Sequence, residues 1–339
     1  MSWRGARICC ALGAFALLRP PSLEAGPARV PIVDLHVDLS YQHNYQGKPF
    51  ESATGEFRAQ DLERAGVRGV VLPLYVPNDV SPSGPRSQDL ERSYARVFGA
   101  LLQTPPYALP GCRRAAGKVS TWLSFEGAAP LARHPEELPL WVARGVRLFG
   151  LVHSHDNPLA GSSGESGSRR KGLSVAGREL ARRIVGLGGV LDVSHASDRA
   201  TEEMIEIGKQ AGVPVVASHS NARALAAHPR NLTDAQIRGL AATGGVVGLN
   251  LHQRFLARRG VAAELSDVIA QVRHIERLVG LEHLALGTDF EGGIRPVPGL
   301  ENVAELQTLA EALRAEGLAE HEIEQIFYKN ALRVLCPPR

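Results

Sequence analysis

The chain has 339 residues, of which 44% are hydrophobic and 22% charged, and its formal net charge is only +3. So small a charge, with 5% aromatic residues and no basic run interleaved with aromatics, argues against nucleic acid as a partner. The length suits one large α/β domain whose core needs no disulfide support.

Residues 1–28 have the order of parts of a secretory signal peptide. Arg4 and Arg7 precede an apolar run over residues 8–18, and small residues follow around Ala25. The run is shorter than the ~20 residues of a transmembrane helix, so no membrane-spanning segment is expected. We expect residues 1–28 to be a leader, residues 29–339 to form one domain, and the protein to be periplasmic or secreted. A cytoplasmic enzyme that keeps this leader is the alternative.

The first expected strand, residues 31–39, carries a polar residue at every second position. Alternation along a strand places Asp34, His36 and Asp38 on one face. An imidazole and a carboxylate placed in this way can hold a borderline metal ion such as zinc. For a single His-x-Asp, a strand-end histidine that is hydrogen-bonded to a neighbouring carboxylate is the better explanation.

Strand-like and helix-like segments alternate along the rest of the chain. Seven further strands are expected, at residues 70–76, 121–125, 146–152, 190–194, 214–217, 246–251 and 284–287. Helices are expected at residues 59–65, 88–102, 135–143, 175–187, 198–211, 234–243, 264–279, 303–316 and 320–335. Ser174, Asp198 and Thr233 are the expected N-caps of three of these helices.

Eight strands, each followed by a helix, predict a (β/α)8 barrel of the TIM type with extra C-terminal helices. A doubly wound open sheet is the alternative. Such a sheet usually carries a glycine-rich phosphate-binding motif after its first strand, and the chain has none there.

Cys112 and Cys336 are the two cysteines that follow the leader. They lack the Cys-x-x-Cys spacing of a zinc or redox site. They could pair in an exported protein, but the sequence does not show their distance, and we favour two unpaired thiols.

Residues suited to metal binding or acid–base chemistry recur where the expected strands end. These residues are His36, Asp38, Glu126, His153, His195, His219 and Asp289. Because the carboxyl ends of barrel strands form one rim, where barrel enzymes build their active sites, we expect them to lie together.

Three imidazoles and three carboxylates can hold two divalent ions, with Glu126 as the bridge. Two ions would activate a shared water and stabilise the charge that forms on an attacked carbonyl. A one-metal site is also compatible with these residues. Asp289 can move a proton from the water to a leaving amine, or can instead hydrogen-bond a metal-binding histidine.

These segments resemble the renal (membrane) dipeptidases, which are metal-dependent hydrolases of the amidohydrolase-like barrel type, and specifically their bacterial members. The matching segments are residues 34–38 (DLHVD), 125–127 (FEG), 150–153 (GLVH), 191–195 (LDVSH), 218–221 (SHSN), 228–232 (HPRNL) and 286–290 (LGTDF). The resemblance runs from about residue 30 to residue 335. Val37 departs from it, since many relatives have Asn there.

The resemblance implies two zinc ions per chain, bridged by Glu126. One would be held by His36, Asp38 and Glu126, and the other by Glu126, His195 and His219.

It also implies that Asp289 is the acid/base and that His153 hydrogen-bonds the scissile carbonyl. Arg230 would pair with the C-terminal carboxylate of the substrate, a task that suits its planar fork. Without the resemblance, Arg230 would be interpreted as a solvated loop charge.

We therefore expect a zinc dipeptidase that cleaves small dipeptides, including those with a C-terminal D-residue, through a hydroxide that bridges the two ions. A homodimer is compatible with the sequence. An N-acyl amino acid deacylase or another amidohydrolase on the same binuclear site is the first alternative, and a non-catalytic metal-bound binding protein is the second.

Overall fold

The computed structural model describes residues 29–51, 55–77, 84–112, 116–165, 170–258 and 260–337. The expected leader, residues 1–28, lies outside the described residues. Within these ranges, no helix combines the length and the apolar character that crossing a membrane requires.

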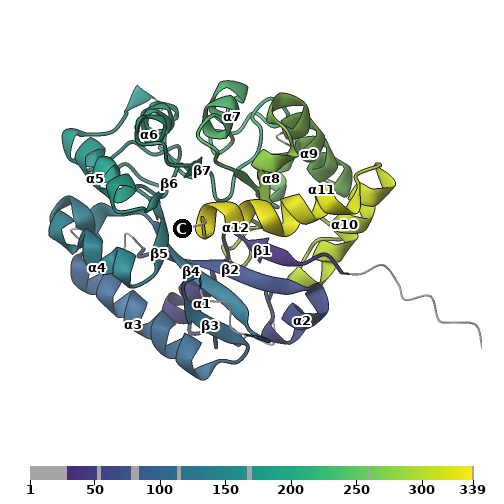
Figure 1. Cartoon of the computed structure of the whole chain (residues 1–339), viewed down its shortest axis with the longest axis horizontal. Helices are drawn as coiled ribbons and strands as arrows, with labels where there is room; N and C mark the ends of the chain where they lie inside the picture. The colour runs from purple at the N-terminus through teal and green to yellow at the C-terminus, as the bar shows by residue number, and fades with distance from the viewer. Residues whose placement is uncertain are drawn as a thin grey trace, which may run out of the picture.

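Eight parallel strands form a ring with helices around it, which confirms the predicted (β/α)8 barrel (Figure 1). The strands are β1 (Ile32–Asp34), β2 (Val67–Leu74), β4 (Val119–Glu126), β5 (Val146–Gly150), β6 (Val190–Asp192), β7 (Val215–Val216), β8 (Val247–Leu249) and β9 (Leu284–Leu286). They follow the order β7-β6-β5-β4-β2-β1-β9-β8. A parallel bridge between Ala217 and Val247 joins β7 to β8 and completes the ring.

A further strand, β3 (Tyr107–Pro110), pairs in parallel with β4 outside the ring and was not expected from the sequence. Prolines at positions 105, 106 and 110 surround and end this segment, and prolines predict turns more than strands. Burial of Tyr107, whose ring lies 5.4 Å from that of Phe50, anchors the strand.

The helices follow the expected pattern closely. They are α1 (Leu39–Tyr45), α2 (Leu62–Ala65), α3 (Ser87–Gln103), α4 (Leu138–Ala143), α5 (Val175–Gly186), α6 (Asp198–Ala211), α7 (Asp234–Ala241), α8 (Gln253–Leu256), α9 (Leu265–Val279), α10 (Leu306–Ala315), α11 (Glu320–Glu324) and α12 (Asn330–Leu335). A π-helical turn, Gln325–Lys329, joins α11 to α12. The short helices α1 and α8 were not expected.

Side-chain caps define where several helices begin. Ser174 accepts a hydrogen bond from the amide of Gly177 at the start of α5, and Thr233 caps α7, as predicted. The prediction that Asp198 caps α6 is wrong. Ser197 accepts the bond from the Ala200 amide and has extended backbone angles, so Asp198 becomes the first helical residue.

The inside of the barrel opposite the candidate site is filled by one apolar cluster. All eight ring strands or the residues next to them contribute to it, together with α12: Val33, Leu35, Val71, Trp122, Leu148, Val190, Val216, Val246, Ala285, Ala331, Val334 and Leu335. Asn330 of α12 donates to the carbonyl of Leu284, the first residue of β9, and to that of Leu281 in the 3-10 turn before it. Helix α12 therefore closes the amino-terminal end of the barrel, and Figure 1 shows it across the centre of the ring.

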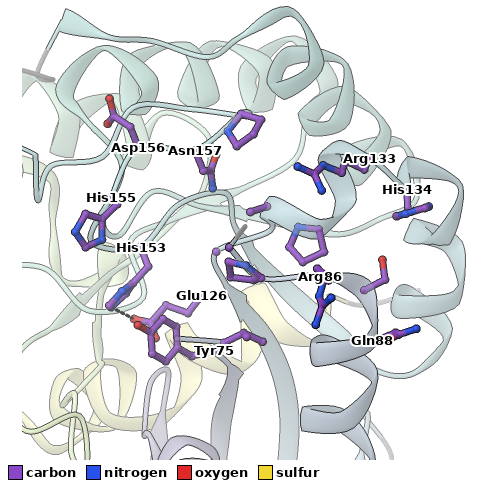
Figure 2. Close-up of a pocket in the computed structure, with 18 residues that line it drawn as sticks. Tyr75, Arg86, Gln88, Glu126, Arg133, His134, His153, His155, Asp156 and Asn157 are labelled. Atoms are coloured by element: carbon purple, nitrogen blue, oxygen red, sulfur yellow. Dashed lines mark ion pairs between the residues drawn. The ribbon is translucent and has the colours of Figure 1, made fainter. Parts of the chain in front are cut away.

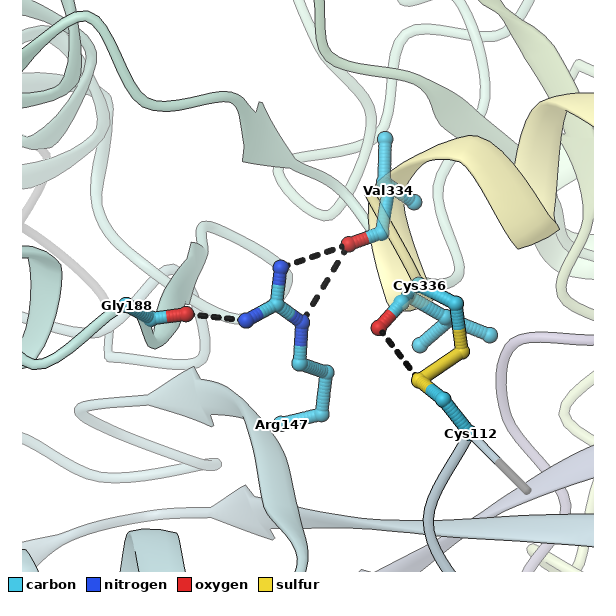
Figure 3. Close-up of a disulfide and its surroundings, with 6 residues drawn as sticks. Cys112, Arg147, Gly188, Val334 and Cys336 are labelled. Carbon is cyan, nitrogen blue, oxygen red and sulfur yellow. Dashed lines mark hydrogen bonds between the residues drawn. A yellow bond between two sulfur atoms is a disulfide. The ribbon is translucent and has the colours of Figure 1, made fainter. Parts of the chain in front are cut away.

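A disulfide joins Cys112, which follows β3, to Cys336, which follows α12 (Figure 3). Their Cα atoms lie 5.7 Å apart, an ordinary separation for a disulfide. The expectation of two unpaired thiols is wrong. The two cysteines are 224 positions apart in the sequence, and only the fold brings them together. Close by, Arg147 donates to the carbonyl of Val334 over 3.0 Å, so the end of α12 is held from two sides.

Candidate metal centre and active site

The seven predicted site residues meet at the carboxyl ends of six strands. Their centre is Oε1 of Glu126, the last residue of β4. The Nε2 atoms of four histidines surround this oxygen: His195 at 3.0 Å, His36 at 3.4 Å, His219 at 3.6 Å and His153 at 3.7 Å. Figure 2 shows Glu126 and His153 facing each other at this centre.

Three overlapping groups of side chains have ligand atoms within 4.8 Å of one another. The groups are His36, Glu126 and His219; Glu126, His153 and His195; and His36, Asp38 and Asp289. They share members with the two predicted ligand sets without reproducing either one. Glu126 and His36 each take part in two groups, which places them in the middle of any metal centre built here.

The chemistry of these donors fits divalent metal ions. Nδ1 of His36 is buried and has no partner among the described residues, whereas its Nε2 makes no hydrogen bond but lies 3.4 Å from carboxylate oxygens of Asp38 and Glu126. Buried polar atoms are normally paired, so such an orphan needs an explanation. Burial, together with nearby Arg230 and the neighbouring histidines, lowers the pKa of His195 and of His219 well below the usual value. Both rings are therefore neutral and can offer a lone pair to a metal.

Glu126 and His36 have pKa shifts in opposite directions. Burial raises the pKa of Glu126, but the charges of His153 and His36 outweigh burial and hold it well below its usual value. Burial lowers the pKa of His36, but the carboxylates of Glu126 and Asp38 outweigh burial and raise it well above its usual value. The central carboxylate is thus kept ionised, as a metal bridge requires.

Neighbouring serines orient two of the imidazoles. The hydroxyl of Ser218 lies 2.7 Å from Nδ1 of His219, and that of Ser154 lies 2.9 Å from Nδ1 of His153. With Nδ1 engaged in this way, Nε2 of each ring faces the centre. These serines are adjacent in sequence to the histidines, so the Ser-His pairs could have indicated the role.

Two buried aspartates tie strand ends together beneath the centre. Asp34 accepts hydrogen bonds from the amides of His36 at 3.0 Å and Thr288 at 3.1 Å, and from the Thr288 hydroxyl at 2.6 Å. Burial raises its pKa to about 6 despite these bonds. The sequence pattern placed Asp34 on one face with His36 and Asp38, but β1 ends at Asp34, so the alternation does not continue.

Asp192, at the end of β6, has the same arrangement as Asp34. It accepts the amides of Ser194 and Ser218, each at 3.0 Å. Ser194 in turn accepts the amide of His219 at 3.1 Å. Asp34 and Asp192 thus set the positions of His36 and His219 through the backbone, and neither role was expected from the sequence.

Asp289 adopts left-handed backbone angles, with φ of 67°, a conformation that costs a non-glycine residue energy and that often marks functional sites. Its amide donates to the carbonyl of His36 at 3.1 Å, and its Oδ2 accepts Nδ2 of Asn250 at 2.9 Å. Burial raises its pKa. A raised pKa suits a carboxyl group that must take up and release a proton.

Glu291, two residues further on, holds the loop that carries Asp289. It also has a positive φ, 66°, and its carboxylate accepts the amides of Glu56 at 2.8 Å and Phe57 at 2.9 Å. Neither Glu56 nor Glu291 was identified from the sequence, because no local pattern links residues so far apart.

Arg230 lines a cavity of about 330 Å³. Asp38, His153, Asp289 and Phe255 also line it. It donates to the carbonyl of His219 at 3.3 Å, and its guanidinium lies 5.7 Å from the centre of the Phe255 ring. It forms no ion pair with any residue that the structure describes. A partly buried guanidinium without an acidic partner, beside a cavity, is suited to bind a carboxylate.

A second cavity, of about 600 Å³, adjoins the first and is lined by Tyr75, Glu126 and His153 as well (Figure 2). The rings of Tyr75 and His153 lie 4.5 Å apart. The candidate metal centre therefore opens onto two cavities rather than one.

Comparison with known proteins agrees with this geometry. The model of the membrane dipeptidase family, peptidase family M19, matches residues 26–337. An uncharacterised protein in the pqqA 5' region of Klebsiella pneumoniae is 35% identical over 218 residues, 62% of this chain and 79% of that protein. Dipeptidase tcpJ of Claviceps purpurea is 29% identical over 65% of this chain, and the match spans about half (51%) of tcpJ.

Among solved structures, a metallo peptidase from Rhodobacter sphaeroides, liganded with a phosphinate mimic of the dipeptide L-Ala-D-Ala, has a TM-score of 0.79. Its sequence is 24% identical, and the match covers 91% of this chain and 99% of that one. At this identity, the likeness shows that the fold is shared.

Proposed function

The chain belongs to the membrane dipeptidase family, peptidase family M19, a family of metallo-dipeptidases, and we propose that it hydrolyses the peptide bond of dipeptides. The observation that carries this proposal is the pairing of a buried His/Glu cluster with an unpaired Arg230 across one small cavity. The cluster suits hydrolysis of an amide, and the arginine suits a substrate with a free carboxylate.

We propose zinc as the metal, with two ions per chain. His36, Asp38 and Glu126 would hold one, and Glu126, His195 and His219 the other. When bound, the ions would supply an ionised bridging water as nucleophile and polarise the scissile carbonyl.

The residues of the chain would then position the substrate and move the proton. Arg230 would hold the C-terminal carboxylate, and Nε2 of His153 would hydrogen-bond the oxygen of the scissile carbonyl. Asp289, held by Asn250, would accept the proton that remains on the attacking hydroxide and deliver it to the leaving amine. Because Arg230 would pair with the free carboxylate, a peptide with a further residue in place of that carboxylate would lose this contact.

We also propose that dipeptides with a C-terminal D-residue are substrates. The ligand of the Rhodobacter sphaeroides metallo peptidase, a phosphinate mimic of L-Ala-D-Ala, supports this proposal. The side chain of either enantiomer would enter the same open cavity while Arg230 keeps the carboxylate.

We propose that the protein is exported to the periplasm or secreted. The signal-like order of residues 1–28 supports export, and so does the Cys112–Cys336 disulfide, because disulfides persist in oxidising compartments.

The test of the proposed function combines metal content with a substrate panel. We expect about two zinc ions per chain and hydrolysis of L-Ala-L-Ala and L-Ala-D-Ala, but not of tripeptides, with activity lost on chelation and restored by zinc. Metal without dipeptide hydrolysis, but with release of amino acids from N-acetyl amino acids, would favour the deacylase. Full activity in a metal-free protein would contradict the proposed chemistry.

A further inference from the structure

The larger cavity has no task in the reaction described above. At about 600 Å³ it is almost twice the size of the cavity that contains Arg230. Both open onto the candidate metal centre, because Tyr75, Glu126 and His153 line both. A substrate group that extends from the smaller cavity past these three residues would enter the larger one.

The larger cavity changes in character along its length. Figure 2 shows Glu126, His153 and Tyr75 at one end and Arg133, His134 and Arg86 at the other. Val76, Pro85, Ala129 and Pro130 add apolar surface to its wall. An occupant with an aliphatic stem and a negatively charged head would match this distribution.

Positive charge at the far end is only partly neutralised, since His134 pairs with Glu136 at 3.1 Å while Arg133 is exposed to solvent. The Arg133 side chain has no ion-pair or hydrogen-bond partner within the described ranges. Arg86 lies 3.5 Å from Asp89, which it shares with Arg92 at 3.6 Å.

Acidic groups of the described wall do not offset this charge. Among the described residues that line the cavity, only Glu126, at the metal centre, and Asp156 are acidic. Asp156 pairs with Lys171 at 3.1 Å and accepts a hydrogen bond from the Ser162 amide. The far end therefore presents an excess of positive charge to the cavity.

The proposed orientation of the substrate assigns the larger cavity to the N-terminal residue. Arg230 would hold the C-terminal carboxylate in the smaller cavity, and His153 would face the scissile carbonyl, which belongs to the N-terminal residue. Because His153 borders both cavities, the N-terminal side chain has the larger one in front of it.

We propose that the larger cavity is a specificity subsite for dipeptides whose N-terminal residue carries a carboxylate on an extended aliphatic side chain. Arg133 is the residue that determines this preference, since its guanidinium can pair with the carboxylate while the apolar wall covers the methylene groups. The proposal deepens the dipeptidase function and rests on it.

The test measures kcat/KM for five dipeptides that share a C-terminal L-Ala: L-Ala, L-Glu, L-Gln, L-α-aminoadipyl and L-Lys at the N-terminus. We expect L-Glu to exceed its neutral isostere L-Gln by about five-fold at low salt, because the pair is partly exposed to solvent. The longer L-α-aminoadipyl residue should show the larger advantage.

Two variants of Arg133 and one control variant test whether Arg133 causes the preference for L-Glu over L-Gln. R133A should bring the Glu/Gln ratio to about one, and R133E should favour L-Lys over L-Glu. The matched control is R182E, which makes the same charge change at an exposed position of α5 that lines neither cavity; it should keep the wild-type ratios.

Each outcome decides between the two proposals. Cleavage of L-Ala-L-Ala with equal rates for L-Glu and L-Gln would overturn the subsite and leave the dipeptidase function standing. An acidic preference that survives in both R133A and R133E would overturn the role of Arg133. No cleavage of any of the five would overturn both proposals.

Discussion

Arg230 is the residue on which the choice of substrate class depends. Replacing it with alanine should lower kcat/KM for L-Ala-L-Ala by about 100- to 1,000-fold, the usual effect of removing one partner of a desolvated charge pair. R230K should recover part of the loss, because lysine keeps the charge but not the planar fork. Steady-state kinetics of the three proteins checks this.

The control for Arg230 is a substrate that lacks the carboxylate. L-Ala-L-Ala amide should be a poor substrate of the wild type, and R230A should change its kcat/KM little. An equal loss on the peptide and on its amide would contradict a role in carboxylate binding and would indicate a structural defect instead.

Glu56 makes the stability of the folded protein depend on pH. Burial, followed by the charges of Glu291 and Asp289, raises its pKa to about 7 from 4.5. Between pH 4.5 and pH 7 the folded state therefore binds more protons than the unfolded state, so the stability contributed by this group falls as the pH rises through that window.

Replacing Glu56 with glutamine should remove this dependence. The amide oxygen of Gln can still accept the Glu291 amide, but no charge is buried at high pH. We expect the Tm of E56Q to equal that of the wild type near pH 5 and to exceed it by about 1–3 °C at pH 8. A constant difference across this range would contradict the assignment, and thermal melts with metal held constant would reveal it.

Among single residues, the polar residues at strand ends were predicted from the sequence, because the carboxyl ends of all strands of a barrel meet at one rim. His36, Glu126, His195 and His219 were found in this way. Asn250, Glu291 and Asp192 were not, because their roles depend on contacts between loops that only the fold brings together. The roles of the seven predicted site residues stay predictions until the variants are measured.

Two glycines, Gly248 in β8 and Gly287 after β9, stand where the backbones of neighbouring strands come close together. A Cβ added at Gly287 would lie 1.7 Å from the carbonyl oxygen of Ser218, and one at Gly248 would lie 1.9 Å from the same atom. Backbone cannot yield as a flexible side chain can. We expect G287A to lower the free energy of unfolding by about 2–4 kcal/mol, as overpacking against backbone does, or to prevent folding.

The matched control for G287A lies in a helix. Gly99, within α3, has open space where a Cβ would stand, so G99A should raise the free energy of unfolding by up to about 1 kcal/mol. Denaturant unfolding of the two variants should therefore move in opposite directions. If G287A were as stable as the wild type, the close approach would be wrong.

Among the elements, the seven later strands and the long helices were predicted well, since apolar runs and 3.6-residue periodicity mark them clearly. Strand β3 was missed because its prolines imitate a turn, and α1 and α8 were missed because four to seven residues carry too little periodicity. The first strand was predicted too long, because its polar residues continue after the pairing ends at Asp34.

The disulfide is a constraint on the whole molecule. Cys112 and Cys336 are 224 positions apart in the sequence. A crosslink that closes so long a loop strongly restricts the conformations of the unfolded chain. The double variant C112S/C336S should lose about 2–4 kcal/mol of unfolding free energy.

Reductant provides the control for the disulfide. It should lower the Tm of the wild type to that of C112S/C336S and leave the variant unchanged. A wild type whose Tm does not respond to reductant under unfolding conditions would contradict a stabilising crosslink.

Helix α12 has a consequence for the order in which the molecule can be made. Its side chains complete the apolar filling of the barrel, yet it follows all eight ring strands in the chain. A nascent chain that has emerged from the ribosome as far as β9 therefore holds every strand but lacks the residues that seal the ring. The apolar interior of the barrel therefore stays incomplete until α12 has emerged.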